Sequence, residues 1–428
     1  MTTKQLIADT LPSGWKIGKL KYFYKFETGF TPPTTRPEYY TPDGEMWVTI
    51  ADMCNSEVTS SKNRISKLYA DSIKAKKVPR GSLLYSFKLS LGKTSIAGCD
   101  TYTNEAIASF SSEKNPCINF LKYSSCMIED NALENIYGAK LLNRERIENA
   151  IIVFPPIKTQ ERIAEYLDKR CSRIDECIKK LQAQLQLVSS YRQSLITRAV
   201  TKGLDPNVEM KDSGVEWIGS IPREWKTSKI SFVSDVTLGK MLCPRQTDSE
   251  QTLETYLCAG SISWDGVKDY IKEMWFSSKE KSELLLIAGD VLVVEGGAGF
   301  GMTTLYKGEH SPCYFQNSII RVRGHHNVMT SDFINYWMRF TYTAYLKTVC
   351  NEATFSHYTK EKVSETPILV PPLNEQKKIA DFCKLVDERV KTICAGIENQ
   401  ISKLNEYRSS LISAAVTGQL AIDEEASA

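Results

Sequence analysis

PPIKTQERIAEYLDKRCSRIDECIKKLQAQLQLVSSYRQSLITRAVTKGL, residues 155–204, returns at residues 371–420 as PPLNEQKKIADFCKLVDERVKTICAGIENQISKLNEYRSSLISAAVTGQL. The two segments align without a gap at an offset of 216 (371 − 155) and share 16 of 50 residues. Average composition would give about three identities by chance. A segment repeated at this length without an insertion predicts one structural element that the chain uses twice.

Both copies carry mostly apolar residues at alternating steps of four and three, the pattern of a helix that packs along another helix. In the first copy this seam is Leu167, Cys171, Ile174, Ile178, Leu181, Leu185, Val188, Arg192, Leu195 and Ala199. In the second it is Cys383, Asp387, Val390, Cys394, Ile397, Ile401, Leu404, Arg408, Leu411 and Ala415.

The Pro-Pro pair that opens each copy can start a helix but cannot lie inside one, so the helices should begin near Thr159 and Glu375. Each would run for about 40 residues, or roughly 60 Å. We expect the two helices to pair as an antiparallel coiled coil, although the connection between them also permits parallel packing. Two unrelated surface helices are the alternative. Arg192 and Arg408 either set the register of the pair or extend to solvent.

The segments before each copy repeat more faintly. Pro12, Trp15, Lys16, Lys19 and Gly29 match residues 210 positions later (222 − 12), and Gly81 matches Gly289 at an offset of 208. Short runs rich in β-branched and aromatic residues alternate with Gly, Pro, Asn and Asp turns, and the helical stretches, such as 331–346, are shorter than the repeated helices. The predicted fold is therefore α+β, with two mixed α/β domains whose sheets are largely antiparallel, separated by the paired helices in a pseudo-twofold repeat.

This pattern gives the following organisation: a first domain at 1–154, a long helix within 155–204, a linker at 205–221, a second domain at 222–370, a second long helix within 371–420, and a tail at 421–428. Hydrophobic residues make up 42% of the 428, which predicts a folded chain. The apolar run 284–294 is interrupted by Asp290, so no membrane span is expected. Twelve cysteines without a C-x-x-C pair, and an N-terminus without a signal-like apolar stretch, predict a cytoplasmic protein.

A net charge of +3 predicts no polyanion partner by itself, but residues 62–80 carry seven basic side chains and one acid, Asp71. Such a cluster would attract phosphates, and the alternative is a solvated helix face. Basic residues of the second domain are scattered near predicted loops or strand ends.

Catalytic motifs are weak. The glycines at 296–301 follow a strand-like run and resemble a nucleotide or S-adenosylmethionine loop, but no helix pattern follows them, which favours a hairpin loop. Gly92-Lys93-Thr94 lacks the first glycine of a phosphate-binding loop, because position 87 is Phe87. The four histidines and the cysteines show no metal-ligand spacing. We therefore expect no cofactor, no metal and no catalytic residue.

The features above, with the helix ends Tyr-Arg-x-Ser-Leu-Ile at 191–196 and 407–412 and the join KDSGVEWIGSIPREW at 211–225, resemble the specificity subunits of type I restriction-modification systems. The resemblance spans nearly the whole chain. Members typically have Glu before the Gln of the Pro-Pro-x-x-x-Gln motif, as in Glu375-Gln376, but the first copy has Thr159-Gln160.

The resemblance implies two target recognition domains that each read one half of a bipartite double-stranded DNA sequence. It also implies that the helices act as a ruler and dock two modification (methyltransferase) subunits. Those partners would bring S-adenosylmethionine, and restriction subunits, where present, would use ATP and Mg²⁺. The chain itself would be a non-catalytic recognition subunit that binds no membrane.

Polar and basic residues in or beside predicted loops are the candidates for DNA contact. In the first domain they are Thr31, Thr34, Arg36, Lys62, Arg64, Lys67, Lys74, Lys76, Lys77 and Arg80. In the second domain they are Lys240, Arg245, Trp264, Arg321, Arg323, His357 and Tyr358. Two other functions stay open: a coiled-coil scaffold that joins two protein-binding modules without DNA, and a methyltransferase that would use the 296–301 glycines.

Overall fold

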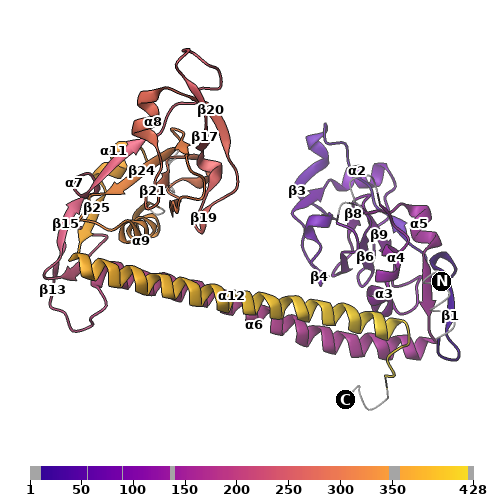
Figure 1. The fold of residues 1–428 in the computed structure, drawn as a ribbon. Coiled ribbons are helices and arrows are strands. Elements are labelled where there is room, and N and C mark those ends of the chain that lie inside the picture. Colours follow the sequence, from indigo (N-terminus) through magenta and orange to yellow (C-terminus); the bar gives the residue numbers. More distant parts are fainter. Residues whose placement is uncertain (1–10, 55, 89, 135–139, 347–356, 423–428) are drawn as a thin grey trace. The chain divides into compact units, whose positions relative to one another are not determined.

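The computed structural model describes residues 11–54, 56–88, 90–134, 140–346 and 357–422. The chain divides into two compact units, Met1–Gln182 with Glu398–Ala428, and Ala183–Ile397 (Figure 1). Each unit contains one of the two predicted domains, the first half of one long helix and the second half of the other.

The first domain is a mixed α/β structure. Its five-stranded sheet has the order β2-β9-β6-β7-β4 and a second sheet has the order β5-β3-β8; only the β4–β7 and β3–β8 pairs are parallel. The elements are β1 (Lys16–Lys19), η1 (Leu20–Tyr22), β2 (Glu27–Thr28), η2 (Pro37–Tyr39), β3 (Tyr40–Val48), η3 (Ile50–Asp52), β4 (Glu57–Val58), β5 (Asn63–Ile65), α2 (Lys67–Ser72), β6 (Leu83–Ser86), β7 (Thr94–Ala97), β8 (Tyr102–Thr103), β9 (Ile107–Phe110), α3 (Ile118–Ser124), α4 (Cys126–Glu129), β10 (Leu133–Glu134), β11 (Lys140–Leu141), α5 (Arg144–Asn149) and β12 (Ile151–Phe154).

The second domain repeats this plan. Its antiparallel sheet has the order β16-β24-β21-β22, and a second sheet, β20-β17-β23, again ends in a parallel pair. The elements are β13 (Met210–Asp212), β14 (Ser220–Pro222), β15 (Lys226–Lys229), α7 (Ile230–Val233), β16 (Ser234–Leu238), β17 (Thr252–Leu257), η4 (Ala259–Ser261), β18 (Ile262–Ser263), β19 (Gly266–Val267), β20 (Lys272–Phe276), α8 (Ser278–Leu284), β21 (Val291–Val294), η5 (Gly297–Gly299), β22 (Thr303–Leu305), β23 (Tyr314–Phe315), β24 (Ile319–Gly324), α9 (Ser331–Thr341), η6 (Tyr342–Leu346), α11 (Lys360–Glu365) and β25 (Pro367–Val370).

The faint repeat between the domains is visible in their structure. The first and last strands pair antiparallel in both, β1 with β12 and β15 with β25. The matched glycines Gly81 and Gly289 both adopt positive φ, +79° and +98°, immediately before the central strands β6 and β21. The predicted mixed domains with largely antiparallel sheets are therefore confirmed.

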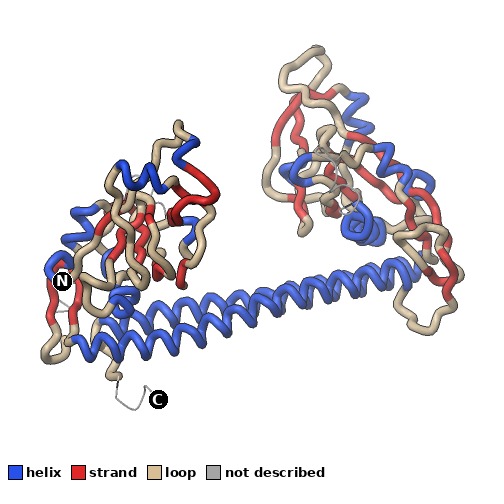
Figure 2. Tube along the Cα trace, turned by 180° about the vertical axis from the view of Figure 1, so that it is seen from behind, coloured by secondary structure: helices blue, strands red, loops and turns tan. Residues whose placement is uncertain are grey.

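The two repeated segments form helices α6 (Ile157–Lys202) and α12 (Leu373–Val416), which lie side by side (Figures 1 and 2). Every predicted seam residue is buried or half-buried in both helices. Five apolar or aromatic residues off the seam, Leu187, Tyr191, Leu385, Ile393 and Tyr407, are exposed. Others off the seam, such as Ile163, Ile196 and Ile379, are buried in the cores that the helices share with the domains. The heptad prediction is confirmed, and each helix begins two residues earlier than expected, directly after the second proline.

The helices run antiparallel. In the first unit, Leu167 near the start of α6 shares an apolar core with Leu411 and Ala415 near the end of α12. In the second unit, Ala199 near the end of α6 shares a core with Cys383 near the start of α12. Both cores also include the side chains of a domain, so each domain is fixed to the beginning of its own helix and to the end of the other.

The glutamine of the repeated Pro-Pro motif has the same role in both copies. Gln160 and Gln376 are fully buried, and their Nε2 atoms donate hydrogen bonds to the carbonyls of Pro155 and Pro371, both at 2.8 Å. These bonds satisfy carbonyl groups at the joint where a strand ends and a helix begins. The Thr159/Glu375 difference lies beside them: Glu375 Oε2 accepts a 2.9 Å hydrogen bond from the buried Trp225 indole, whereas the first copy has no carboxylate there.

The two seam arginines form ion pairs across the helices. Arg192 Nε lies 2.7 Å from Asp387 Oδ1, and Arg408 Nη1 lies 2.7 Å from Asp175 Oδ1. Asp387 has further partners on α9: Tyr336 donates to its Oδ2 at 3.0 Å, and Arg339 lies 3.8 Å away. Burial raises the pKa of Tyr336, and the negative charge of Asp387 adds to the rise, so this phenol stays a donor. Of the two interpretations of the seam arginines, the structure favours register-setting.

Asp387→Ala is expected to lower the free energy of unfolding of the second unit by about 2 kcal/mol. The substitution removes a half-buried carboxylate that Arg192, Tyr336 and Arg339 share. Asp175→Ala should cost less than about 1 kcal/mol, because 58% of the Asp175 side chain is exposed and its ion pair within the described part of the chain is with Arg408. Thermal unfolding of the two variants measures the difference. Equal losses would show that Asp387 does not tie α9 to the helix pair.

The predicted linker differs in detail from expectation. Residues 205–221, expected to be a linker, contain β13 and most of β14, which pair antiparallel, and Ile218 and Ile221 are buried in the core of the second unit. The segment is thus an ordered part of that unit. Both long helices end before a glycine with positive φ, Gly203 at +74° and Gly418 shortly after Val416 at +76°, the usual C-terminal geometry. Residues 423–428 of the expected tail lie outside the described residues.

Candidate nucleic-acid interface

The basic cluster of the first domain lies on β5, on α2 and on the loop that follows. Ile65 and Ala70 are fully buried and anchor the strand and the helix. The basic side chains around them face outward, and all seven are exposed: Lys62, Arg64, Lys67, Lys74, Lys76, Lys77 and Arg80. A strand and a short helix therefore present the cations together.

An aromatic stack joins α2 to the polar loop 31–36. The ring of Tyr69 stacks on Tyr39 with centroids 4.1 Å apart and lies 6.2 Å from Phe30. Trp47 Nε1 donates to the Phe30 carbonyl at 2.9 Å, and Tyr40 donates to the Pro32 carbonyl at 2.8 Å. Thr31, Thr34 and Arg36 are exposed on this loop. The structure thus brings the two candidate groups of the first domain together.

Some polar groups of this surface already have partners. Thr31 donates to Glu105, and Arg36 pairs with Glu38 at 3.3 Å. Arg64 donates to the Gly44 carbonyl at 2.9 Å. Lys77 pairs with Glu45 at 2.8 Å, and this hydrogen bond raises the pKa of Lys77.

Five cations of the cluster have side chains with no hydrogen bond or ion pair to any other described residue: Lys62, Lys67, Lys74, Lys76 and Arg80. Their charge is available to an external anion.

Lys74 adopts an unusual backbone conformation directly after α2. Its φ is +51°, a left-handed geometry that costs a residue with a Cβ roughly 1 kcal/mol relative to glycine. The turn is held by a 2.9 Å hydrogen bond from the Ala75 N–H to the Ala70 carbonyl. Lys74, Lys76 and Lys77 line a cleft of about 430 Å³ that Gly29 and Thr103 also line. Glycine would adopt this φ at a lower conformational cost than lysine does. The presence of lysine therefore favours a function for the side chain of Lys74.

The second domain has a matching loop. Gly29 lies against the Thr103 carbonyl and Gly239 against the Gln316 carbonyl. In both domains the next residue donates a backbone hydrogen bond to the same crossing strand, Phe30 to Thr103 and Lys240 to Phe315. Loop 240–251 therefore corresponds to the first-domain loop 30–39. Extending the match of the two glycines would have identified the whole of loop 240–251 from the sequence.

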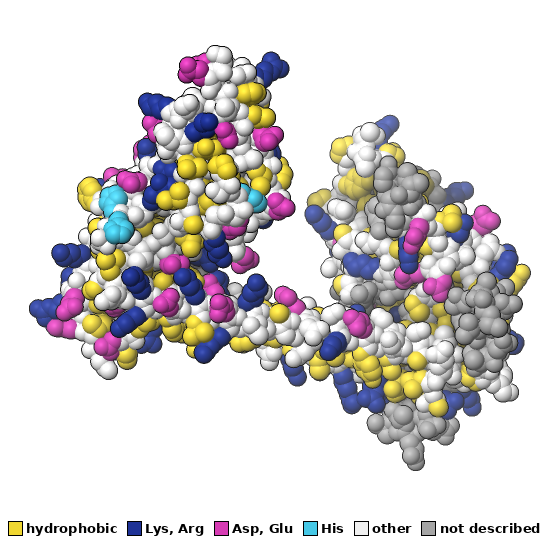
Figure 3. Space-filling model, viewed as in Figure 1, with side chains coloured by type: hydrophobic (Ala, Val, Ile, Leu, Met, Phe, Trp, Pro, Cys, Tyr) yellow, Lys and Arg dark blue, Asp and Glu magenta, His cyan; other side chains and the backbone are white. Residues whose placement is uncertain are grey.

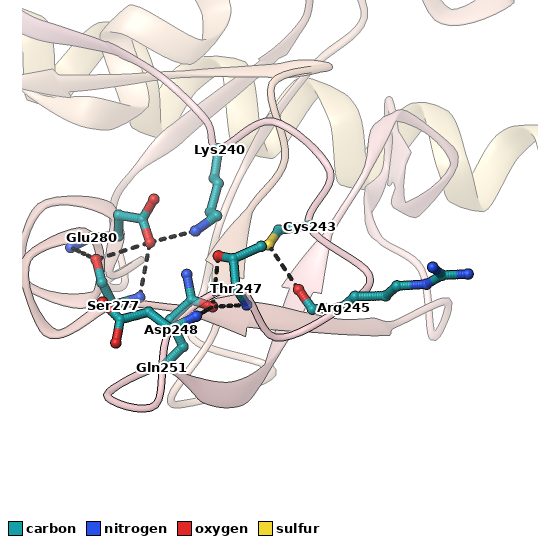
Figure 4. Close-up of polar contacts among 8 residues, drawn as sticks. All are labelled: Lys240, Cys243, Arg245, Thr247, Asp248, Gln251, Ser277 and Glu280. Atoms are coloured by element: carbon teal, nitrogen blue, oxygen red, sulfur yellow. Dashed lines mark hydrogen bonds and ion pairs between the residues drawn. The ribbon is translucent and has the colours of Figure 1, made fainter.

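Of the two candidates in this loop, Arg245 is exposed, and Figure 4 shows its side chain extending away from the other labelled residues. Lys240 instead pairs with Glu280 and lies over the Phe276 ring, and only 10% of its side chain is exposed. The Lys240–Glu280 pair attaches the loop to α8, so the charge of Lys240 is already paired within the domain.

Three further candidates of the second domain are occupied inside it. Arg321 is buried, and its guanidinium donates to the carbonyls of Glu283 and Leu285, both at 3.1 Å. Arg323 forms a two-pronged pair with the fully buried Asp290 at 2.6 and 2.7 Å. Tyr358 is buried against Thr366. Their side chains maintain the fold and are not offered to a ligand.

The remaining two candidates are at least partly accessible. His357 is exposed beside Gly296, and Trp264 is half-buried with its ring 4.9 Å from Tyr342. Over the second domain, the face in Figure 3 shows Lys and Arg side chains interspersed with Asp and Glu. Neither positive nor negative charge dominates this face. Among the candidate basic residues, the second domain therefore offers fewer free cations than the first: Lys240, Arg321 and Arg323 are paired within the domain.

The glycines at 296–301 connect β21 to β22 in an antiparallel hairpin, and a strand, not a helix, follows them. The hairpin interpretation is therefore confirmed, and this loop lacks the helix N-terminus that a dinucleotide or S-adenosylmethionine site uses.

The model of the "Type I restriction modification DNA specificity domain" matches this chain twice, at residues 12–187 and 222–403. The chain belongs to this family. Each match covers one domain and most of the helix that follows it, which is the repeat unit of the sequence.

Known specificity subunits resemble this one at low identity. The MjaVIII specificity subunit of Methanocaldococcus jannaschii is 23% identical over 308 residues, 67% of this chain and 65% of that protein. The StySPI subunit of Salmonella potsdam is 24% identical over 63% of this chain and 57% of its own length. The chain thus spans less than two thirds of these two relatives. The MjaIX specificity subunit of M. jannaschii matches over 98% of this chain and 97% of its own length at 21% identity.

A solved structure described as "Structural basis underlying complex assembly and conformational transition of the type I R-M system" aligns with a TM-score of 0.70 at 15% identity. The alignment covers 96% of this specificity subunit and 100% of that chain, so the two share a fold. Within the described ranges, no helix is long and apolar enough to cross a bilayer. The same residues include no group of three or more His, Cys, Asp or Glu arranged to hold a metal ion.

Proposed function

We propose that this chain reads a bipartite sequence in double-stranded DNA and holds two modification (methyltransferase) subunits on it, without a catalytic step of its own. The first domain reads one half-site and the second domain reads the other. The partner subunits supply S-adenosylmethionine and the methyl transfer, and restriction subunits, where the system has them, supply ATP-dependent cleavage.

The observation that carries this proposal is the contrast between fixed and variable parts. The two helical repeats align position by position without a gap, whereas the loops at equivalent positions, 30–39 and 240–251, differ in length and in sequence. Two unlike loops on a repeated frame suit two unlike half-sites, because base identity is read by side chains and loop shape. The paired helices then set the gap between the half-sites.

The proposal gives the first domain a phosphate-binding role. Lys67→Ala with Lys76→Ala, assayed as the complex with the modification subunits, should weaken binding to all DNA sequences about equally. It should also lower the slope of log affinity against log salt by about two, one unit for each lost phosphate contact. Fluorescence anisotropy over a salt series measures both quantities.

The matched control is Lys16→Ala with Lys25→Ala, which removes the same charge from exposed positions at and after β1 of the same domain. Its salt slope should equal that of the wild-type complex. An unchanged slope in the Lys67/Lys76 variant would make the cluster a solvated face. Absence of DNA binding by the wild-type complex would support the scaffold function instead.

A further inference from the structure

The centre of the basic cluster carries an apolar side chain that the fold does not use. Leu68 lies on α2 and is 83% exposed, more than any other large apolar side chain of the described residues. It directly follows Lys67, and residues 62–80 include one acid, Asp71. The apolar surface of Leu68 is open to a ligand, and burying it against an apolar group of that ligand would gain hydrophobic free energy.

The helix holds Leu68 in a fixed place. Ala70, on the inner face of α2, is fully buried, and Tyr69, the residue after Leu68, is stacked on Tyr39. Ser72 Oγ donates to the Tyr69 carbonyl at 2.7 Å and closes the last turn. Since its neighbours are anchored, Leu68 projects from a rigid element and not from a mobile loop. A rigid apolar group can discriminate between ligands at little entropic cost.

The positive charge of the segment around Leu68 indicates which class of partner would bind there. Core positions of protein interfaces are depleted in charged residues, whereas Leu68 follows Lys67 in a segment, 62–80, that carries seven exposed basic side chains. The major groove of DNA is flanked by phosphates, is about 12 Å wide and admits a helix. The C5-methyl group of thymine is the apolar feature that the bases present there, and small apolar side chains contact it.

We propose that Leu68 is a specificity-determining residue of the first domain that contacts the C5-methyl group of a thymine in the first half-site. Lys67 and the other free cations of the cluster bind the flanking phosphates and bring α2 into the groove. This inference rests on the proposed function and goes beyond it, because it assigns one base preference to one side chain.

The test removes only the methyl group. A target duplex is selected from a random-sequence pool by the wild-type complex with its modification subunits, and each thymine is then replaced singly by uracil. One replacement, in the half-site of the first domain, should weaken wild-type binding about fourfold, the effect of one buried methyl group. For Leu68→Ala the thymine and uracil duplexes should bind equally. Leu133→Ala, at an exposed leucine of the same domain, should keep the fourfold discrimination.

The outcomes separate the inference from the function on which it rests. Equal wild-type affinity for every thymine and uracil pair, a first half-site without thymine, or full discrimination by Leu68→Ala would each overturn the role of Leu68 while DNA recognition stands. A pool from which the complex enriches no sequence would refute the proposed function and this inference with it. A protein partner at Leu68 would appear as lost assembly of the Leu68→Ala complex with unchanged discrimination, which also overturns it.

Discussion

Deletion of one heptad from each long helix, residues 181–187 of α6 and the facing residues 393–399 of α12, is expected to abolish recognition of the original bipartite target. The pairs Arg192–Asp387 and Arg408–Asp175 place these two segments opposite each other. Seven residues are two helical turns, so the seam keeps its phase while each helix shortens by about 10 Å. That length corresponds to about three base pairs.

Selection from a pool of duplexes with variable gaps measures the effect. The two half-sites should keep their bases, because no domain residue is changed, and the preferred gap should shorten by up to about three base pairs. At the original gap, affinity should fall to the non-specific level, a loss of at least about a thousandfold. An unchanged gap would show that the helices do not set the spacing. Thermal unfolding of the deletion variant establishes that it is folded.

Gly29→Ala is expected to destabilise the first domain by more than about 4 kcal/mol. A Cβ at Gly29 would lie 1.9 Å from the Thr103 carbonyl oxygen, and at Gly239 it would lie 2.3 Å from the Gln316 carbonyl oxygen. Both of these oxygens belong to the backbone, so the clash cannot be relieved by rotating a side chain. The hydrogen bond from Phe30 to Thr103 at 2.9 Å holds the chain at this close crossing.

Each glycine variant should affect one half of the target. Gly29→Ala should lower the melting temperature and remove recognition of the first half-site, and Gly239→Ala should do the same for the second. Differential scanning calorimetry and half-site selection are the measurements. Gly396→Ala is the control: nothing lies within 4 Å of its added Cβ, and alanine in the interior of α12 should stabilise by about 0.5 to 1 kcal/mol. Normal melting of Gly29→Ala would contradict the close crossing.

The long helices could be predicted residue by residue because their pattern is local. A heptad seam depends on spacing alone, and burial follows the seam from Leu167 to Ala199 and from Cys383 to Ala415. The helix starts were expected two residues late because a proline was taken to delay the helix. The carbonyl of Pro156 in fact already accepts hydrogen bonds from the N–H groups of Thr159 and Gln160.

The candidate site of the first domain was visible because its basic residues are clustered within one short segment, 62–80. In the second domain the same approach selected Arg321 and Arg323, whose role depends on the tertiary structure. Asp290 was noted only as an interruption of an apolar run, yet a buried carboxylate requires a partner, and Arg323 provides it. The partner of a buried acid comes from a different strand, so single-residue reasoning along the chain could not find it.

Leu68 was missed for a related reason. A leucine within a basic helix is expected to face the core, and only the burial of Ala70 and the stacking of Tyr69 show that the opposite face carries it. A helix of six residues is too short for the spacing of its apolar residues to show which face points to the core.

The buried glutamines have a mechanical consequence. Only two prolines separate β12 from α6 and β25 from α12, and Gln160 and Gln376 bind back across those joints to Pro155 and Pro371. The proline rings fix φ, and a glutamine of the helix binds the carbonyl of the first proline. The backbone between each domain and the start of its own helix therefore cannot rotate freely. Mutations in a surface loop can therefore change the surface of a domain without changing the angle between that domain and its own helix.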